Sequence, residues 1–227
     1  MIGYFVTGTD TSVGKTYVTC TLARRARLQG QKVFAFKPIE SGCERRPDGT
    51  YVGADQELLV ESAGAWQLGP LRGLYQLPLP AAPLVAAEDA GTAIDLDLIV
   101  GVASQAIQRE QPDLTLVEGA GGWRVPITRN ADTSTLARAL GLPLVVVARA
   151  GLGTINHTLL TVEAIERDGL PVAAVVFSQR RDDDLRAALR NRDEVLRRWP
   201  GTLLVLGEDP AAVDSLVTPP SIIHASR

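Results

Sequence analysis

Short apolar segments rich in β-branched residues recur along this chain, and helical patterns lie between them. The predicted strands cover residues 2–7, 33–37, 114–118, 144–148, 172–177 and 203–206. Several are almost continuously apolar, as strands buried on both faces of a parallel sheet are. The predicted helices cover residues 15–28, 96–109, 155–167 and 182–198. This alternation predicts an α/β fold with a mostly parallel sheet and helices on both faces. No stretch of 1–227 reads as a linker or a repeat, so we expect a single domain.

Local signals refine these helices. Asp95 is a plausible N-cap for the helix at 96–109, and Gly169 is a plausible C-terminal stop for the helix at 155–167. The helix at 182–198 carries one apolar stripe, formed by Leu185, Ala188, Leu189, Leu196 and Trp199. The segment 70–83, rich in proline and leucine, reads as a loop packed over the domain.

The composition excludes several classes of protein. With 45% apolar and 22% charged residues the chain is neither disordered nor fibrous, and a net charge of −3 gives no reason to expect a nucleic-acid or anionic-membrane partner. We find no apolar run near the ~20 residues of a membrane span and no signal peptide. Cys20 and Cys43 are too few for a disulfide framework. We therefore expect a cytoplasmic protein.

The first predicted strand runs into a phosphate-binding pattern. Gly8 opens a loop that ends in Gly14-Lys15-Thr16, and the next helix begins there. Loops of this kind hold phosphate oxygens with backbone amides and a helix N-terminus, while the lysine neutralises charge and the hydroxyl ligates magnesium. Five residues separate Gly8 from Gly14 where the usual pattern has four. The position between a strand and a helix still predicts a P-loop and a nucleotide-phosphate site.

Acidic residues at two other places could complete a magnesium site. Glu118 ends an apolar strand and precedes Gly119-Ala-Gly-Gly122, whose glycines let the backbone approach a ligand. In a parallel sheet, sites form at the carboxyl ends of strands, so Glu118 can reach a metal near the P-loop. Asp55 precedes a helical run and is either a second carboxylate for magnesium or an N-cap.

Lysine is scarce in this chain. Of 23 basic residues, only Lys15, Lys32 and Lys37 are lysines. Lys37 ends the second predicted strand, so it falls on the same sheet edge as the P-loop and can stabilise negative charge on a transferred phosphate. With two histidines, the chain has little material for a histidine metal cluster or a Ser/His/Asp triad.

Five segments together resemble one known family. They are YFVTGTDTSVGKT near the start, KPIESG around Lys37, LVEGAGGWRVP at 116–126, GLGTINHTLLT at 151–161 and LGEDP at 206–210. They are similar to dethiobiotin synthetases of biotin biosynthesis, which have the same P-loop spacing. The resemblance implies a P-loop NTPase-like fold and ATP- and Mg²⁺-dependent closure of 7,8-diaminononanoate with CO₂ into a cyclic urea. One amine forms a carbamate, ATP converts it to a carbamic-phosphoric anhydride, and the second amine closes the ring.

The resemblance also implies roles for individual residues. Lys15 and Lys37 would be the catalytic cations, and Thr16, Asp55 and Glu118 would bind Mg²⁺. ATP would lie against Ser12, Val13, Gly14, Lys15, Thr16, Tyr17, Glu118, Gly119, Ala120, Gly121, Ser178, Gln179, Pro210, Ala211 and Ala212. The diamine would contact Thr11, Ser41, Gly153, Thr154 and Asn156. The family's active site lies at a homodimer interface, so the segment 153–156 would act on the partner subunit's substrate.

One departure from the family concerns the base. Its members often carry an Asn-Asp pair after the strand at 172–177, whereas this chain has Ser178 and Gln179. The nucleotide preference therefore stays open at this point. Another P-loop amidase or ligase acting on a different small acid is an alternative, and a nucleotide-dependent switch that binds a protein partner is a more distant one.

Overall fold

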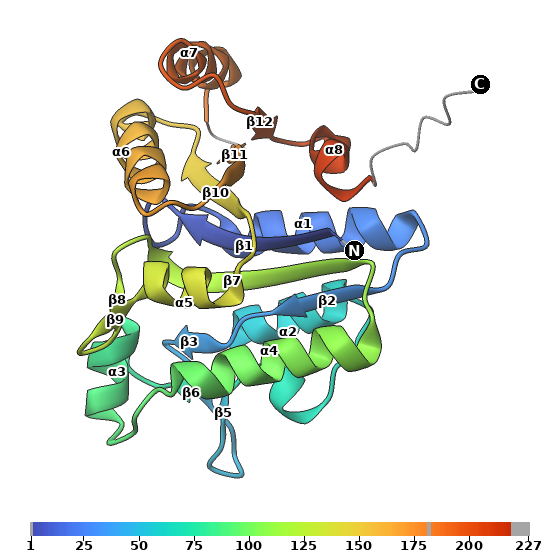
Figure 1. Cartoon of the computed structure of the whole chain (residues 1–227), viewed down its shortest axis with the longest axis vertical. Helices are drawn as coiled ribbons and strands as arrows, with labels where there is room; N and C mark the ends of the chain where they lie inside the picture. Colours follow the sequence, from blue (N-terminus) through green and yellow to red (C-terminus); the bar gives the residue numbers. More distant parts are fainter. Residues whose placement is uncertain (1, 181–182, 219–227) are drawn as a thin grey trace.

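A computed structural model describes residues 2–180 and 183–218 and has a six-stranded parallel sheet at its centre (Figure 1). Its strand order is β12-β11-β10-β1-β7-β2. The strands are β1 (Ile2–Gly8), β2 (Val33–Phe36), β7 (Leu114–Gly122), β10 (Leu144–Arg149), β11 (Val172–Ser178) and β12 (Leu203–Leu206). All six predicted strands are present, and every neighbouring pair is parallel, as the apolar runs predicted.

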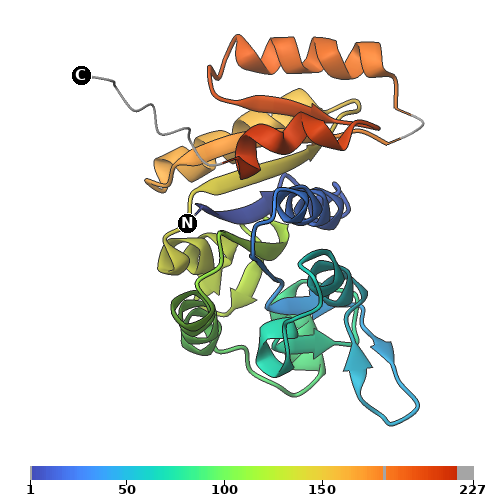
Figure 2. The ribbon, with the colours of Figure 1, turned by 90° about the vertical axis from the view of Figure 1, so that its right-hand side faces the viewer.

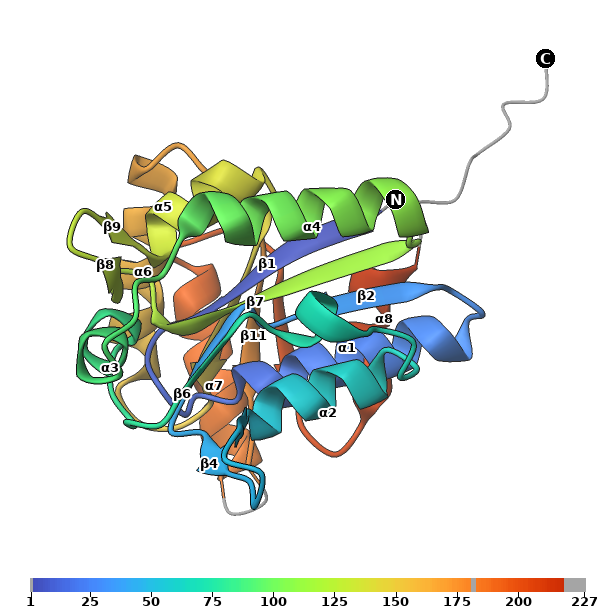
Figure 3. The same ribbon diagram turned by 90° about the horizontal axis from the view of Figure 1, so that it is seen from below.

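Helices cover both faces of this sheet (Figure 3). One face packs against α1 (Lys15–Leu28), α2 (Ala54–Ser62) and α8 (Asp214–Val217). The other packs against α3 (Pro83–Asp89), α4 (Leu96–Glu110), α5 (Thr133–Leu140), α6 (Thr154–Arg167) and α7 (Leu185–Leu196). The prediction of helices on both faces is confirmed. Among the described residues, none of the helices combines the length and the apolar character that crossing a membrane requires.

Two of the predicted helix ends have the expected chemistry. The Asp95 side chain accepts a hydrogen bond from the Leu98 N–H at the start of α4. Helix α6 ends just before Gly169, which has a φ of 77°, a left-handed conformation that glycine adopts without a Cβ clash.

The segment 70–83 is more ordered than the loop we predicted. It includes most of a 3₁₀ turn, η1 (Gly69–Arg72), and the strand β6 (Tyr75–Leu77), which pairs in parallel with β3 (Ile39–Ser41). The prediction was wrong because a strand of three residues is too short to show a period, and the flanking prolines read as loop.

Helix α7 differs from its prediction in two respects. Its N-cap is Asp184, and position 182, where we expected the helix to begin, lies outside the described residues. Leu185 and Leu189 do not face the core: they are 51% and 36% exposed. Ala188 and Trp199 of the predicted stripe are buried, together with Val195, because this narrower face packs against α6 and the sheet.

Smaller elements extend from the main layers. A hairpin of β4 (Glu44–Arg45) and β5 (Tyr51–Val52) projects from one end of the molecule (Figure 2). The strands β8 (Pro126–Thr128) and β9 (Ala131–Asp132) form a second hairpin after β7.

The register of the central strands brings the predicted functional segments to one edge. Gly8, at the end of β1, pairs with Gly122 of β7 and Val147 of β10. Phe36 pairs with Val117, so Lys37, just after β2, lies beside Glu118. Glu118 is inside β7 and not at its end as predicted, because the strand continues to Gly122. Residues far apart in the chain therefore meet beside the P-loop.

Candidate active site

The P-loop connects β1 to α1 as the sequence predicted. Gly14 is the N-cap of α1 and has a φ of 100°, and no side chain caps the helix. Ser12 also has a left-handed backbone, with a φ of 57°. The first N–H groups of a helix lack partners within the helix, so an uncapped N-terminus at this loop is suited to bind an anion.

Glu118 lies directly below this loop and is fully buried. Its Oε1 accepts a hydrogen bond from the Thr16 hydroxyl at 2.8 Å, and its Oε2 accepts one from the Thr19 hydroxyl at 2.7 Å. The carboxylate is thus fixed against the first turns of α1.

Lys37 lies between two carboxylates. Its Nζ is 3.0 Å from Glu118 Oε1 and also contacts Asp55 Oδ2. Burial lowers the pKa of Lys37, but Glu118 and Asp55 outweigh this effect and raise it. Burial likewise raises the pKa of Asp55, but Lys37 holds it below its ordinary value. Both groups are therefore charged at neutral pH.

Asp55 is in the first turn of α2, and the alternative that it is the N-cap is wrong. The N-cap is Gly53, which has no side chain to accept a hydrogen bond. The Glu40 carboxylate caps the helix instead. It accepts hydrogen bonds from the backbone N–H groups of Asp55 at 3.0 Å and Gln56 at 2.8 Å. The Asp55 side chain is thereby left to face Lys37.

Lys15 is the second buried ammonium of the site. Its Nζ donates to the carbonyl oxygen of Asp10 at 3.1 Å across the P-loop. Burial lowers the pKa of Lys15 to about 8, although Glu118 opposes the change. With Lys37, it gives the site a pair of lysines beneath the loop.

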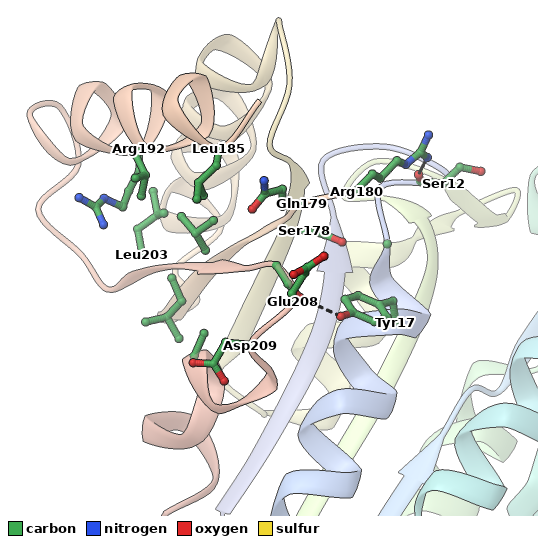
Figure 4. Close-up of a pocket in the computed structure, with 16 residues that line it drawn as sticks. Ser12, Tyr17, Ser178, Gln179, Arg180, Leu185, Arg192, Leu203, Glu208 and Asp209 are labelled. Carbon is green, nitrogen blue, oxygen red and sulfur yellow. Dashed lines mark hydrogen bonds between the residues drawn. The ribbon is translucent and has the colours of Figure 1, made fainter. Parts of the chain in front are cut away.

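A large pocket opens on the other side of the P-loop (Figure 4). Its volume is about 1230 Å³. The predicted ATP-binding residues that line it are Ser12, Gly14, Tyr17, Ser178, Gln179 and Ala212. Other lining residues include the charged side chains of Arg180, Arg192, Glu208 and Asp209 and four leucines, Leu185, Leu189, Leu203 and Leu204. The Tyr17 hydroxyl donates to the Gly207 carbonyl at 3.1 Å and so links α1 to the end of β12.

A small pocket of about 30 Å³ separates the P-loop from the start of α6. Gly153 and Thr154 line it from α6, and Thr9, Asp10 and Val13 line it from the loop. The neighbouring Leu152 is fully exposed, with a relative accessibility of 101%. Asn156, on the first turn of α6, is exposed as well.

Other predicted residues stand apart from these groups. Within the described part of the chain, the side chains of Thr11 and Ser41 make no hydrogen bond to the lysine–carboxylate cluster. Pro210 and Ala211 begin the turn η2 (Pro210–Val213) and do not line the large pocket, although Asp209 and Ala212 on either side do. Gly119, Ala120 and Gly121 form the irregular end of β7, opposite the start of the P-loop.

Comparison with known proteins identifies the family. A family model described as an AAA domain matches residues 3–212. The chain is 43% identical over 199 residues to the ATP-dependent dethiobiotin synthetase BioD of Anaeromyxobacter dehalogenans strain 2CP-C, covering 87% of this chain and 85% of that protein. The chain belongs to the dethiobiotin synthetase family. A BioD from Anaeromyxobacter sp. strain Fw109-5 is 43% identical over 213 residues, which cover 93% of this chain and 89% of the relative.

Solved structures place this dethiobiotin synthetase family member among P-loop folds. A chain of the Aquifex aeolicus MinC:MinD cell division protein complex matches with a TM-score of 0.58, covering 96% of this chain and 86% of that chain, at 14% identity. The receptor FtsY from Elizabethkingia anophelis matches with a TM-score of 0.52 and the same identity, covering 65% of its chain. At this identity the likeness concerns the fold alone.

Sequence reasoning missed three residues of this dethiobiotin synthetase family site. Thr19 lies one helical turn after Lys15, and that spacing could have predicted its place beside Glu118. Glu40 lies within the KPIESG segment, and the lack of a capping side chain at Gly53 was a signal for an external acceptor. Arg180 carried no signal, because its contact partner is 168 residues away along the chain.

Proposed function

We propose that this protein is an ATP-dependent ligase that converts 7,8-diaminononanoate and CO₂ to dethiobiotin, a step of biotin biosynthesis. The observation that carries the proposal is the buried cluster in which Lys37 contacts Asp55 and Glu118 directly beneath the P-loop. The family to which the chain belongs supports the ATP dependence and the product. The whole chain would act as one ATP-binding domain.

The reaction needs three bonding changes. One amine of the diamine adds to CO₂ and loses a proton to give a carbamate. A carbamate oxygen attacks the γ-phosphorus of ATP, the bond to ADP breaks, and a carbamic-phosphoric anhydride forms. The second amine then attacks the carbamate carbon and loses a proton, phosphate leaves, and the cyclic urea closes. Phosphorylation is required because a free carbamate oxygen is a poor leaving group.

The protein's own part is positioning and charge stabilisation, as in other phosphoryl transfers. Lys15, held at the P-loop by the Asp10 carbonyl, would stabilise charge on the β- and γ-phosphates. Lys37, 6% exposed, would stabilise charge on the carbamate and on the transferred phosphoryl group. The carboxylates of Asp55 and Glu118 hold the Lys37 ammonium in one position and keep it charged.

The site has the donor set that Mg²⁺ prefers. Thr16, Asp55 and Glu118 supply one hydroxyl and two carboxylates, and Mg²⁺ is commonly held by one or two carboxylates with water and substrate phosphates. No group of three or more His, Cys, Asp or Glu side chains with metal-binding geometry occurs among residues 2–180 and 183–218. When bound, Mg²⁺ would neutralise phosphate charge. Asp55 and Glu118 both contact the Lys37 ammonium, so the two carboxylates converge on one place beside the P-loop, as shared metal ligands must.

The large pocket is suited to the nucleoside part of ATP. It adjoins Gly14 and Tyr17, so a nucleotide with phosphates on the P-loop would extend its base toward Gln179 and Ala212. The Gln179 amide nitrogen donates to the Asp183 carbonyl at 3.2 Å, which leaves the amide oxygen as the group that could accept from a base.

A homodimer would complete the diamine site. In this proposal Thr11 and Ser41 contact the diamine from one subunit, while Gly153, Thr154 and Asn156 of α6 bind its carboxylate across the interface. Leu152, just before α6, is fully exposed and would be covered in such a dimer. Both cysteines are buried and unbridged, which is in keeping with a reducing cytoplasm.

The test is phosphate release from MgATP in bicarbonate buffer, with and without 7,8-diaminononanoate, followed by mass spectrometry of the product. We expect diamine-dependent phosphate release and a cyclic urea. Binding of ATP without any response to the diamine would overturn the substrate and favour a related ligase acting on another small acid. A nucleotide-dependent switch would hydrolyse ATP slowly with no small-molecule substrate.

A further inference from the structure

The segment that follows β11 touches the P-loop at two points. Ser178 contacts the loop at Gly14, and Arg180 contacts it at Ser12 (Figure 4). These are the two P-loop residues between Asp10 and Lys15 that have a left-handed backbone. The family resemblance gave Ser178 a part in reading the base and gave Arg180 no part.

The contact at Gly14 leaves no room for a side chain. A Cβ at this position would collide with the Ser178 hydroxyl and lie 2.9 Å from the Ser178 Cβ. Ser178 is itself only 6% exposed, and its strand partner in β10 is Arg149. A small residue at 178 therefore lets the sheet support the N-cap of α1 directly.

The contact at Ser12 is a hydrogen bond from a charged group. The Arg180 guanidinium Nη2 donates to the Ser12 carbonyl oxygen at 3.0 Å. The backbone of Arg180 is held in turn by Asp183: the Arg180 N–H donates to the Asp183 carboxylate at 2.8 Å, and the Asp183 N–H donates to the Arg180 carbonyl at 3.1 Å. The arginine is thus attached at its backbone to its own turn and at its guanidinium to the P-loop.

We infer that Arg180 is a positioning residue for the nucleotide's phosphates, acting through the Ser12–Val13 peptide. The inference rests on the nucleotide site proposed above. A trans peptide is planar, with its C=O and N–H pointing in opposite directions. Holding the Ser12 carbonyl toward Arg180 therefore fixes the direction of the Val13 N–H. No partner for that N–H is found within the described residues, so it is available to an anion.

The energetic reason is the strained backbone. Ser12 has a left-handed backbone, which glycine adopts freely and other residues seldom do. Without a restraint, the Ser12 backbone would therefore be more stable in another conformation. A charge-assisted hydrogen bond from Arg180 opposes that relaxation. The loop is then pre-organised, and the nucleotide does not have to order it on binding.

The experiment compares two probes on the same variants. Mg-tripolyphosphate has the phosphates and no base, whereas MgATP has both. Titration calorimetry on Arg180→Ala should show affinities for both probes reduced by a similar factor, about tenfold, as expected for a lost hydrogen bond from a charged donor. Arg180→Lys, which keeps a donor, should recover part of the loss. The control is Arg186→Ala, on the exposed surface of α7, which should change neither affinity.

Steady-state kinetics separates positioning from catalysis. With Arg180→Ala we expect the KM for MgATP to rise and kcat to stay within about twofold, as for an interaction equal in ground and transition states. A loss of ATP affinity without loss of tripolyphosphate affinity would make Arg180 a base reader and overturn the inference. The inference would also be overturned if Arg180→Ala lowered kcat at unchanged KM, or if it changed neither the kinetic constants nor the two affinities. If the wild-type protein binds neither probe, the proposed function itself fails.

Discussion

Lys37 follows the end of β2, Glu118 lies within the neighbouring strand β7, and their charged groups meet 3.0 Å apart beneath the P-loop. The pair exists because Phe36 of β2 lies beside Val117 of β7, so the next residue of each strand reaches the same point. Eighty-one residues separate the two along the chain. The ion pair therefore depends on strand order rather than on any local pattern.

Replacing Lys37 by alanine should stop the chemistry and spare nucleotide binding. Because Lys15 and the loop amides remain, MgATP affinity should be largely intact, while dethiobiotin formation should fall about a hundredfold or more, as is typical of lost transition-state charge stabilisation. Single-turnover rates and ATP titrations measure the two effects. Lys32→Ala, at an exposed lysine paired with Glu110, is the matched control and should behave as wild type. Wild-type turnover in Lys37→Ala would contradict the assignment.

Replacing Glu118 by glutamine should destabilise the fold. The change removes a buried charge that accepts hydrogen bonds from Thr16, Thr19 and Lys37. Breaking a buried pair in this way costs about 3 kcal/mol of unfolding free energy. Urea denaturation measures it. Glu110→Gln breaks an ion pair in which both side chains are more than a third exposed and should cost less than about 1 kcal/mol. If both variants lost the same free energy of unfolding, Glu118 would not stabilise the fold more than an exposed glutamate does.

Asp168 should make stability depend on pH in the acid range. Its carboxylate accepts from Trp123 Nε1 at 2.8 Å and Arg124 Nη2 at 3.0 Å, and so fastens the loop after β7 to the end of α6. Burial raises the pKa of Asp168, but the hydrogen bonds from Arg124 and Trp123 hold it below its ordinary value.

The folded pKa lies below the unfolded value of about 3.9, so this stabilisation is complete above that pH and is lost as the pH falls below it. Asp168→Ala should therefore cost about 2 kcal/mol at pH 7, and the difference from wild type should shrink as the pH falls below about 4. Melting temperatures across that range measure the trend. Asp193→Ala, at an exposed aspartate paired with its neighbour Arg192, should show little effect. A difference independent of pH would contradict the role of the charge.

Leu152 should matter for assembly. Leu152 is fully exposed beside the predicted diamine-binding residues, so in the proposed dimer it would lie at the subunit interface. Leu152→Asp should shift the protein from dimer to monomer in light scattering and remove most of its turnover. Leu68→Asp changes a leucine that is 73% exposed at the start of η1, away from α6, and should leave both properties unchanged. A wild-type protein that is monomeric while active would rule out the shared site.

Local patterns in the sequence predict the layers of the fold and the P-loop. Apolar runs of strand length identified all six central strands, because a buried parallel strand is apolar on both faces, and Gly14-Lys15-Thr16 marked the start of α1. The family resemblance, also carried by local motifs, named the lysines and carboxylates individually. Such signals are readable because each lies within a few consecutive residues.

Tertiary structure alone decided which of those residues meet. It paired Lys37 with Glu118 and Asp55, gave Glu40 the capping of α2, and turned Leu185 and Leu189 outward along the large pocket. It also brought Arg180 to Ser12 across 168 positions of sequence. These contacts follow from strand order, register and helix rotation, which are set by the packing of the whole core and leave no mark on any short stretch of the chain.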